Sequence, residues 1–145
     1  MKDCSSRTAE TNGADIRVVG DRFVFQSEVF FDTGQALLLP EGRAELEKLA
    51  TALVDLDKQI PNEIAWVLRV DGHTDVRPIN SPLFKSNWEL SSARAISVVQ
   101  YLVSLGVPAQ RLVAAGFAEF QPLDSAPNED AYRRNRRIEL KLTER

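Results

Sequence analysis

The chain has 145 residues, 43% of them hydrophobic and 27% charged, and its formal net charge is −3. This composition fits one compact domain and excludes a collagenous, low-complexity or wholly disordered chain. No apolar run approaches the roughly 20 residues that cross a bilayer, so we expect membrane contact only through an upstream segment outside this sequence. Cys4 is the only cysteine, which excludes an internal disulfide and a multi-thiolate metal site.

The first part of the sequence is predicted to hold a tail and a hairpin. Residues 1–15 are polar and small, so we expect a flexible tail or the end of a linker there, followed by one domain over residues 16–145. Ile16–Val19 and Arg22–Phe25 flank the turn pair Gly20-Asp21. This pattern favours a short hairpin, because glycine accepts positive φ at little cost.

Three further elements follow in the middle of the chain. The short apolar run Val29–Phe31 predicts a strand. Pro40 opens a predicted helix whose apolar residues recur at steps of three and four as far as Leu56. The almost continuously apolar segment Ile64–Val70 predicts a central strand covered on both faces, and it runs directly into the polar cluster Asp71–Asp75.

The last part of the chain repeats this alternation. Ser91 is the expected N-cap of a second helix that ends near Leu105. Leu112–Phe117 predicts a strand and Asn128–Asn135 a short helix, and the alternating apolar residues of 138–142 predict a final, half-exposed strand. The order of elements indicates an α/β or α+β class, with one sheet covered by two main helices.

The cluster Asp71–Asp75 contains the only histidine of the chain, His73. A metal site would combine it with carboxylates: Asp71, Asp75 and Asp32. We predict no metal, because no second imidazole or thiolate could complete a closed site. A hydrolase would place Ser91 or Cys4 beside His73, but no nucleophile-elbow pattern surrounds any serine. We expect His73 and Thr74 to be turn residues that bond the loop backbone.

A second cluster, Asn87–Ala95, surrounds the predicted start of the second helix. With Ser91 as N-cap, Arg94 takes the third helical position, where a cation opposes the helix dipole by a few tenths of a kcal/mol. This favours either an internal pair with Asp75 or Glu89, or a ligand anion held by Arg94 and the free N–H groups of the helix start.

Together the two clusters suggest a binding site for a zwitterion. If Asp75 and Arg94 face one pocket, Asp75 would hold an ammonium group and Arg94 a carboxylate. The ligand would then carry an amino-acid head group. We see no activated nucleophile and no acid/base pair, so we predict binding without catalysis and without a cofactor.

From about Val24 to Leu142 the sequence resembles the OmpA-like C-terminal domain shared by OmpA, the lipoprotein Pal and the flagellar stator protein MotB. The matching segments are Val29–Gly34, Gly72–Asp75, Asn87–Ala95, Gly106-Val107, Arg111-Leu112, Gly116-Phe117, Pro122 and Asn135–Arg137. The long loop between Asp75 and Arg94, together with Trp88, is more similar to MotB-type members. The resemblance implies an α+β fold, an α/β sandwich with a βαβαβ-type mixed sheet, two main helices on one face and a short N-terminal hairpin.

The resemblance also implies a ligand and roles for the site residues. Family members bind peptidoglycan non-covalently through the diaminopimelate of its stem peptide, with Asp75 matching the residue for the amine and Arg94 the residue for the carboxylate. Further ligand-binding positions implied in this way are Phe31, Asp32, Thr33, Gly34, Asn87 and Leu90. Supporting positions are His73, Thr74, Ser91, Asn135 and Arg136. The implied location is the periplasm or cell envelope, where the domain would anchor an envelope or flagellar-motor protein, with a homodimer as one possible state.

The alternative is polyanion or nucleic-acid binding through the C-terminal stretch. Residues 132–145 hold six Lys or Arg against two acidic residues. No aromatic stacking series or recognition-helix motif accompanies these cations, so we favour a solvated face and predict no nucleic-acid partner. The two classes differ in salt response, because binding to phosphates weakens steeply as salt rises.

Overall fold

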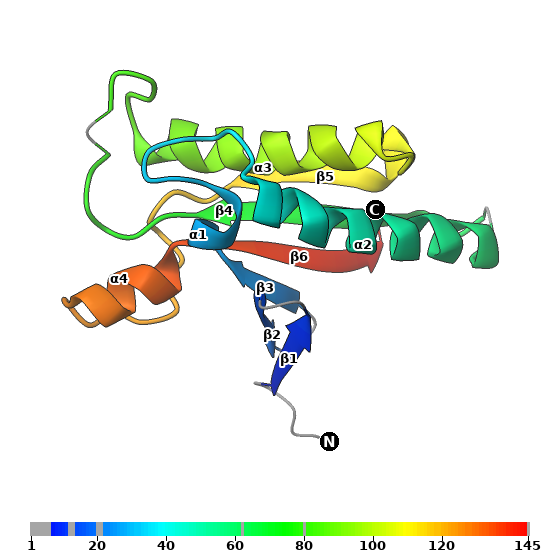
Figure 1. Ribbon diagram of the computed structural model, residues 1–145, viewed down its shortest axis with the longest axis horizontal. Helices are drawn as coiled ribbons and strands as arrows, with labels where there is room; N and C mark the ends of the chain where they lie inside the picture. The colour runs from blue at the N-terminus through cyan, green and yellow to red at the C-terminus, as the bar shows by residue number, and fades with distance from the viewer. Residues whose placement is uncertain (1–6, 12–13, 20–21, 62, 80, 145) are drawn as a thin grey trace.

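The computed structural model of the chain describes residues 7–11, 14–19, 22–61, 63–79 and 81–144, with side chains from residue 22 onward. They form a six-stranded mixed sheet with helices (Figure 1). The strands are β1 (Arg7–Thr11), β2 (Ala14–Val19), β3 (Arg22–Gln26), β4 (Trp66–His73), β5 (Leu112–Gly116) and β6 (Arg137–Glu144). The helices are α1 (Ser27–Phe30), α2 (Pro40–Gln59), α3 (Asn87–Ser104), the 3₁₀ turn η1 (Ala109–Arg111) and α4 (Glu129–Asn135).

The sheet runs in the order β1-β2-β3-β6-β4-β5. Strand β6 enters between β3 and β4 and is antiparallel to both. Strands β4 and β5 are parallel, as expected for strands joined by the crossover helix α3. This order places β4, the longest apolar strand of the sequence, between two neighbours. The predicted fold class, with its mixed sheet and N-terminal hairpin, is confirmed.

Helices α2 and α3 run beside each other over one face of the sheet (Figure 1). Alternate residues of the two central strands supply the floor of the core: Leu68, Val70, Ile138 and Leu140. Helix α3 lies so close to β4 that a Cβ on Gly72 would come within 2.2 Å of the Ser91 carbonyl oxygen. Only a glycine fits at this position, and its lack of a side chain sets the short distance between α3 and the strand.

Two predictions for the N-terminal region need correction or remain open. The prediction of a flexible tail is wrong for Arg7–Thr11. These residues form strand β1, which pairs antiparallel with β2. The boundary of the domain itself stays a prediction. The hairpin strands β2 and β3 pair as expected, and the turn pair Gly20-Asp21 lies outside the described residues.

The strand predicted at Val29–Phe31 is wrong. Ser27–Phe30 is instead the one-turn helix α1, whose Phe30 is fully buried against the core. An apolar run of three residues has no period of its own, so tertiary packing decides its conformation.

The predicted element ends also shift near the polar clusters. Strand β4 continues through His73, because Asp71, Gly72 and His73 pair with β6, so His73 is a strand residue and not a turn residue. The start of β6 is buried on both faces instead of half exposed. No helix within the described part of the chain combines the length and apolar character of a membrane span.

Candidate functional site

A cleft of about 670 Å³ opens beside the carboxyl end of β4. Its walls come from the loops that follow α1 and β4, from helix α3, and from α4, segments that Figure 1 shows at one end of the molecule. The lining residues are Thr33, Gly34, Gln35, Thr74, Asp75, Arg77, Pro78, Ile79, Ser81, Pro82, Asn87, Arg94, Glu129 and Arg136. Asp75 and Arg94, the two residues on which the sequence argument depends, therefore line one cleft.

Asp75 is the anionic group of the cleft wall next to β4. Its Oδ1 accepts the backbone N–H of Arg77 at 2.8 Å, and its Oδ2 accepts from the guanidinium groups of Arg77 and Arg136, each at 2.8 Å. Burial raises the pKa of Asp75, but these hydrogen bonds outweigh burial and hold the pKa below its ordinary value. Asp75 is thus ionised at neutral pH.

Arg94 reaches the cleft from α3 and is only 5% exposed. Its Nε donates to the carbonyl oxygen of Gln35 at 2.8 Å, its Nη2 donates to that of Asp32 at 3.0 Å, and its guanidinium lies 5.1 Å from the centre of the Phe31 ring. Burial lowers the pKa of Arg94 to about 10, which leaves it cationic at neutral pH. These contacts fix the guanidinium plane at the cleft wall.

The expected surroundings of Arg94 need two corrections. Helix α3 begins at Asn87 with Ser86 as its N-cap, so Ser91 lies inside the helix and Arg94 lies about two turns from the start. The free N–H groups of the helix start are therefore not beside it. Arg94 also pairs with neither expected carboxylate, because Asp75 bonds Arg77 and Arg136 while Glu89 accepts the backbone N–H of Lys85.

The other expected ligand-binding residues divide into two groups. Thr33, Gly34 and Asn87 line the cleft, and Gly34 has the positive φ of 68° that suits a glycine. Phe31 and Asp32 stand behind Arg94 and hold its guanidinium, the one with its ring and the other with its backbone carbonyl. Leu90 is buried on the inner face of α3.

The expected supporting residues are spread more widely. Thr74 and Arg136 line the cleft itself. Ser91 ties α3 to the loop after β5, because its Oγ accepts the backbone N–H of Ala118 at 3.1 Å. Asn135 fastens the loop before α4, since its Oδ1 accepts from the N–H groups of Leu123 and Asp124. His73 does not line the cleft.

Sequence reasoning missed several lining residues, of which Arg77 is the most prominent. Its Nη1 donates to Glu129 at 3.3 Å in addition to its bonds with Asp75, and its guanidinium lies 4.5 Å from the centre of the Tyr132 ring. An arginine two residues after Asp75 was the available signal. The other missed residues are Gln35, Pro78, Ile79, Ser81, Pro82 and Glu129.

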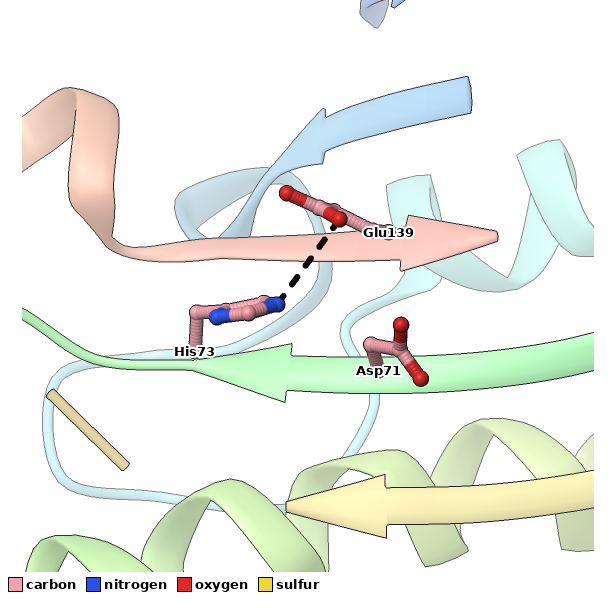
Figure 2. A group of neighbouring side chains, drawn as sticks. All are labelled: Asp71, His73 and Glu139. Atoms are coloured by element: carbon pink, nitrogen blue, oxygen red, sulfur yellow. Dashed lines mark ion pairs between the residues drawn. The ribbon is translucent and has the colours of Figure 1, made fainter. Parts of the chain in front are cut away.

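A second polar group lies on the sheet face away from α2 and α3. Asp71, His73 and Glu139 each offer a ligand atom within 4.8 Å of the others (Figure 2). Both oxygens of Asp71 already accept from Arg69, at 2.8 and 2.9 Å, and Glu139 accepts from Arg22 and Arg137. A metal ion would have to displace these guanidinium groups, so the three residues fit an ion-pair network better than a metal centre.

Most arginines of the C-terminal stretch also have acidic partners. Arg133 pairs with Asp130, Arg134 with Asp124, and Arg137 with Glu139. Arg136 donates to Asp75, Glu28 and Glu129. A phosphate backbone would have to compete with each of these carboxylates, which disfavours the polyanion alternative.

A mixed sheet backed by two helices, with charges of both signs in one cleft, defines a small ligand-binding domain of the α+β class. The chain belongs to the OmpA family, whose model matches residues 30–136. It is 39% identical over 141 residues to the uncharacterized protein YtxE of Bacillus subtilis, an alignment that covers 97% of this chain and 54% of that protein. The chain thus spans about half the length of this curated relative.

Solved structures show the same fold. The periplasmic domain of Helicobacter pylori MotB matches with a TM-score of 0.79 at 19% identity, over 97% of this chain and 88% of that one. The cell wall anchor of the T6SS from Pseudomonas aeruginosa matches with a TM-score of 0.73 at 24% identity, over 97% and 89%. The predicted resemblance to the OmpA family is confirmed, and the fold is shared with the periplasmic domain of MotB.

Proposed function

We propose that this domain binds peptidoglycan non-covalently, through the diaminopimelate of the stem peptide, and so anchors the protein that carries it to the cell wall. One observation carries the proposal. Asp75 and Arg94, which come from distant segments, line the same cleft without pairing with each other. A site with separate opposite charges matches a ligand that carries an ammonium and a carboxylate group.

Each residue would hold a separate end of the ligand. The Nε and Nη2 groups of Arg94 donate hydrogen bonds to backbone carbonyls, so Nη1 would bind the ligand carboxylate. The ammonium group would reach Asp75 by replacing Arg77, whose side chain is 49% exposed. Arg136 would stay in place, because Glu28 and Glu129 hold it as well.

Membership of the family and the likeness to a cell wall anchor support this function. Binding requires no chemical step, so we propose that the domain acts as an anchor and not as an enzyme. We place it in the cell envelope, on the outer side of the cytoplasmic membrane, where peptidoglycan is found. A homodimer stays a prediction.

The test compares ligands that differ by one charged group. We expect the domain to sediment with diaminopimelate-type peptidoglycan and to bind free diaminopimelate in calorimetry. A stem peptide with lysine in place of diaminopimelate should bind at least tenfold more weakly than the diaminopimelate-type stem peptide, because its side chain ends in an ammonium group without a carboxylate for Arg94 to hold. Asp75→Asn and Arg94→Lys should each weaken binding at least tenfold, since one removes the charge and the other removes the planar guanidinium that two backbone carbonyls hold with Nη1 left for the ligand.

Arg133→Lys is the matched control. It changes an exposed arginine that pairs with Asp130 and does not line the cleft, so its binding should equal that of the unchanged protein. Equal binding of the lysine-type and the diaminopimelate-type stem peptides would refute capture of the carboxylate. Retained sedimentation of both cleft variants would refute the site.

A further inference from the structure

Two large aromatic side chains lie together in water at the surface. Trp88 and Phe120 are 53% and 57% exposed, and their ring centres lie 5.2 Å apart with the ring planes tilted by 33°. Single exposed apolar residues are common on protein surfaces, whereas a paired aromatic surface is a typical contact for a ligand. Neither ring is needed for the core, whose described members come from elsewhere.

The aromatic pair is carried by segments that contact the cleft wall. Trp88 directly follows Asn87, which lines the cleft and donates through Nδ2 to the carbonyl oxygen of Arg77 at 3.1 Å. The same Nδ2 lies 3.5 Å from Oε1 of Glu119, which directly precedes Phe120. One amide group therefore joins the cleft wall to the two segments that carry the rings.

We infer that Trp88 and Phe120 form a sugar-binding platform for the glycan strand of peptidoglycan. This inference rests on the function proposed above. The stem peptide is covalently attached to the glycan, so a cleft that holds the peptide brings a sugar within a few residues' length, about 3.5 Å per residue, of its rim. Asn87, which lines the cleft, directly precedes Trp88 of the platform.

The chemistry of the platform suits a pyranose ring. The faces of such a ring carry C–H groups, and these pack well against the electron-rich face of an aromatic ring. Trp and Phe provide this area at little conformational cost, because each has only two side-chain torsions. Glu119, half buried beside the platform, supplies carboxylate oxygens that accept hydrogen bonds from sugar hydroxyl or acetamido groups.

The two rings favour a sugar over a protein partner. A stable protein interface buries about 800 Å² on each partner, whereas two half-exposed rings offer only a fraction of this area. A single sugar ring is comparable in size to the pair. The contacts of Asn87 with the cleft wall and with Glu119 also favour one orientation of the sugar, since the peptide and the glycan of one molecule would bind side by side.

The experiment separates the two parts of the ligand. Digestion of peptidoglycan with an amidase yields peptide-free glycan strands and free stem peptides, and each is titrated against the domain. Trp66 is 3% exposed, so a change in tryptophan emission on adding glycan strands reports Trp88. We expect such a change with glycan strands, and expect Trp88→Ala and Phe120→Ala to abolish glycan binding and to weaken binding to intact peptidoglycan about fivefold or more.

Three comparisons make the result decisive. Both alanine variants should bind free stem peptide within about twofold of the unchanged protein. Trp88→Phe should still bind glycan strands in calorimetry, because it keeps an aromatic face. Ile96→Ala, an exposed apolar change on the same helix, should have no effect on either ligand. Circular dichroism confirms that each variant is folded.

The outcomes also separate this inference from the function on which it rests. If glycan strands do not bind and both alanine variants hold intact peptidoglycan normally, the platform is refuted while the cleft stands. The platform is also refuted if the alanine variants lose stem-peptide binding, because the rings would then act on the cleft. If Asp75→Asn and Arg94→Lys bind stem peptide normally, the proposed function fails.

Discussion

At the scale of single residues, His73 shows how one face of β4 differs from the other. The ring of His73 stacks on Phe117 with a centroid distance of 4.9 Å. Both ring nitrogens are buried without a hydrogen-bond partner among the described residues, and Nε2 lies 3.8 Å from Glu139. Burial lowers the pKa of His73 to about 4, helped by the nearby charge of Arg137, although Glu139 opposes this. His73 is therefore neutral in the folded domain at neutral pH.

This neutral histidine makes stability depend on pH in a defined window. In the unfolded chain His73 binds a proton below about pH 6.5, whereas in the folded chain its pKa is about 4 and it stays neutral until that pH. The contribution of neutral His73 to the free energy of unfolding should thus be complete above pH 6.5. It should fall by on the order of 3 kcal/mol as the pH drops to 4. In His73→Phe, which keeps the stacking, this part of the loss should be absent, as measured by urea unfolding between pH 4 and 7.

The difference between the two proteins isolates His73, because every carboxylate titrates in both. Parallel curves of unfolding free energy against pH would contradict a neutral, buried histidine. Binding to peptidoglycan at pH 7 should be unchanged in His73→Phe, since this side chain does not line the cleft.

At the scale of elements, the start of α3 decides where the cleft residues lie. The Oγ of Ser86 accepts the backbone N–H of Glu89 at 3.2 Å, and Oε1 of Glu89 accepts the N–H of Lys85 at 2.8 Å. This reciprocal pattern is similar to a capping box. The signal was present in the sequence as a serine, Ser86, followed three residues later by a glutamate, Glu89.

Removing the cap should loosen the first turn of α3. Ser86→Ala should lower the free energy of unfolding by about 1 kcal/mol in urea titrations, because the N–H of Glu89 loses its acceptor. Ser104→Ala, at the exposed end of the same helix, should cost less than half as much. If the two variants lost equal stability, Ser86 would not be the cap.

At the scale of the whole molecule, charge is balanced within the fold. The net charge is −3, and the C-terminal arginines bond to acidic residues from several segments. Binding that depends on one ammonium and one carboxylate releases few counterions. A protein with six phosphate contacts, in contrast, loses about a thousandfold or more in affinity between 50 and 200 mM salt.

We therefore expect a weak response to salt. The affinity for diaminopimelate-type peptidoglycan should change by less than about tenfold between 50 and 200 mM sodium chloride, as measured by sedimentation with sacculi. Under the same conditions duplex DNA should not bind detectably. A steep loss of peptidoglycan binding, or strong DNA binding, would favour the polyanion alternative.

Local patterns in the amino-acid sequence were enough to locate the long elements and the pair of residues at the centre of the proposal. The helical apolar period located α2, which buries one stripe of its surface. A continuous apolar run located the inner half of β4, which is covered on both faces. Both patterns are local properties of the sequence. The motif spacing singled out Asp75 and Arg94 before any geometry was known. Their places in one cleft agree with that expectation.

The ends of the elements and the partners of the charges depend instead on contacts between distant segments. Pairing with β6 extends strand β4 to His73. Packing of Phe30 against the core favours a helix at Ser27–Phe30. Asp75 bonds Arg136, which lies 61 positions away. Such contacts depend on the order of strands in the sheet, and a strand order is set by the packing of the whole chain and not by any local pattern.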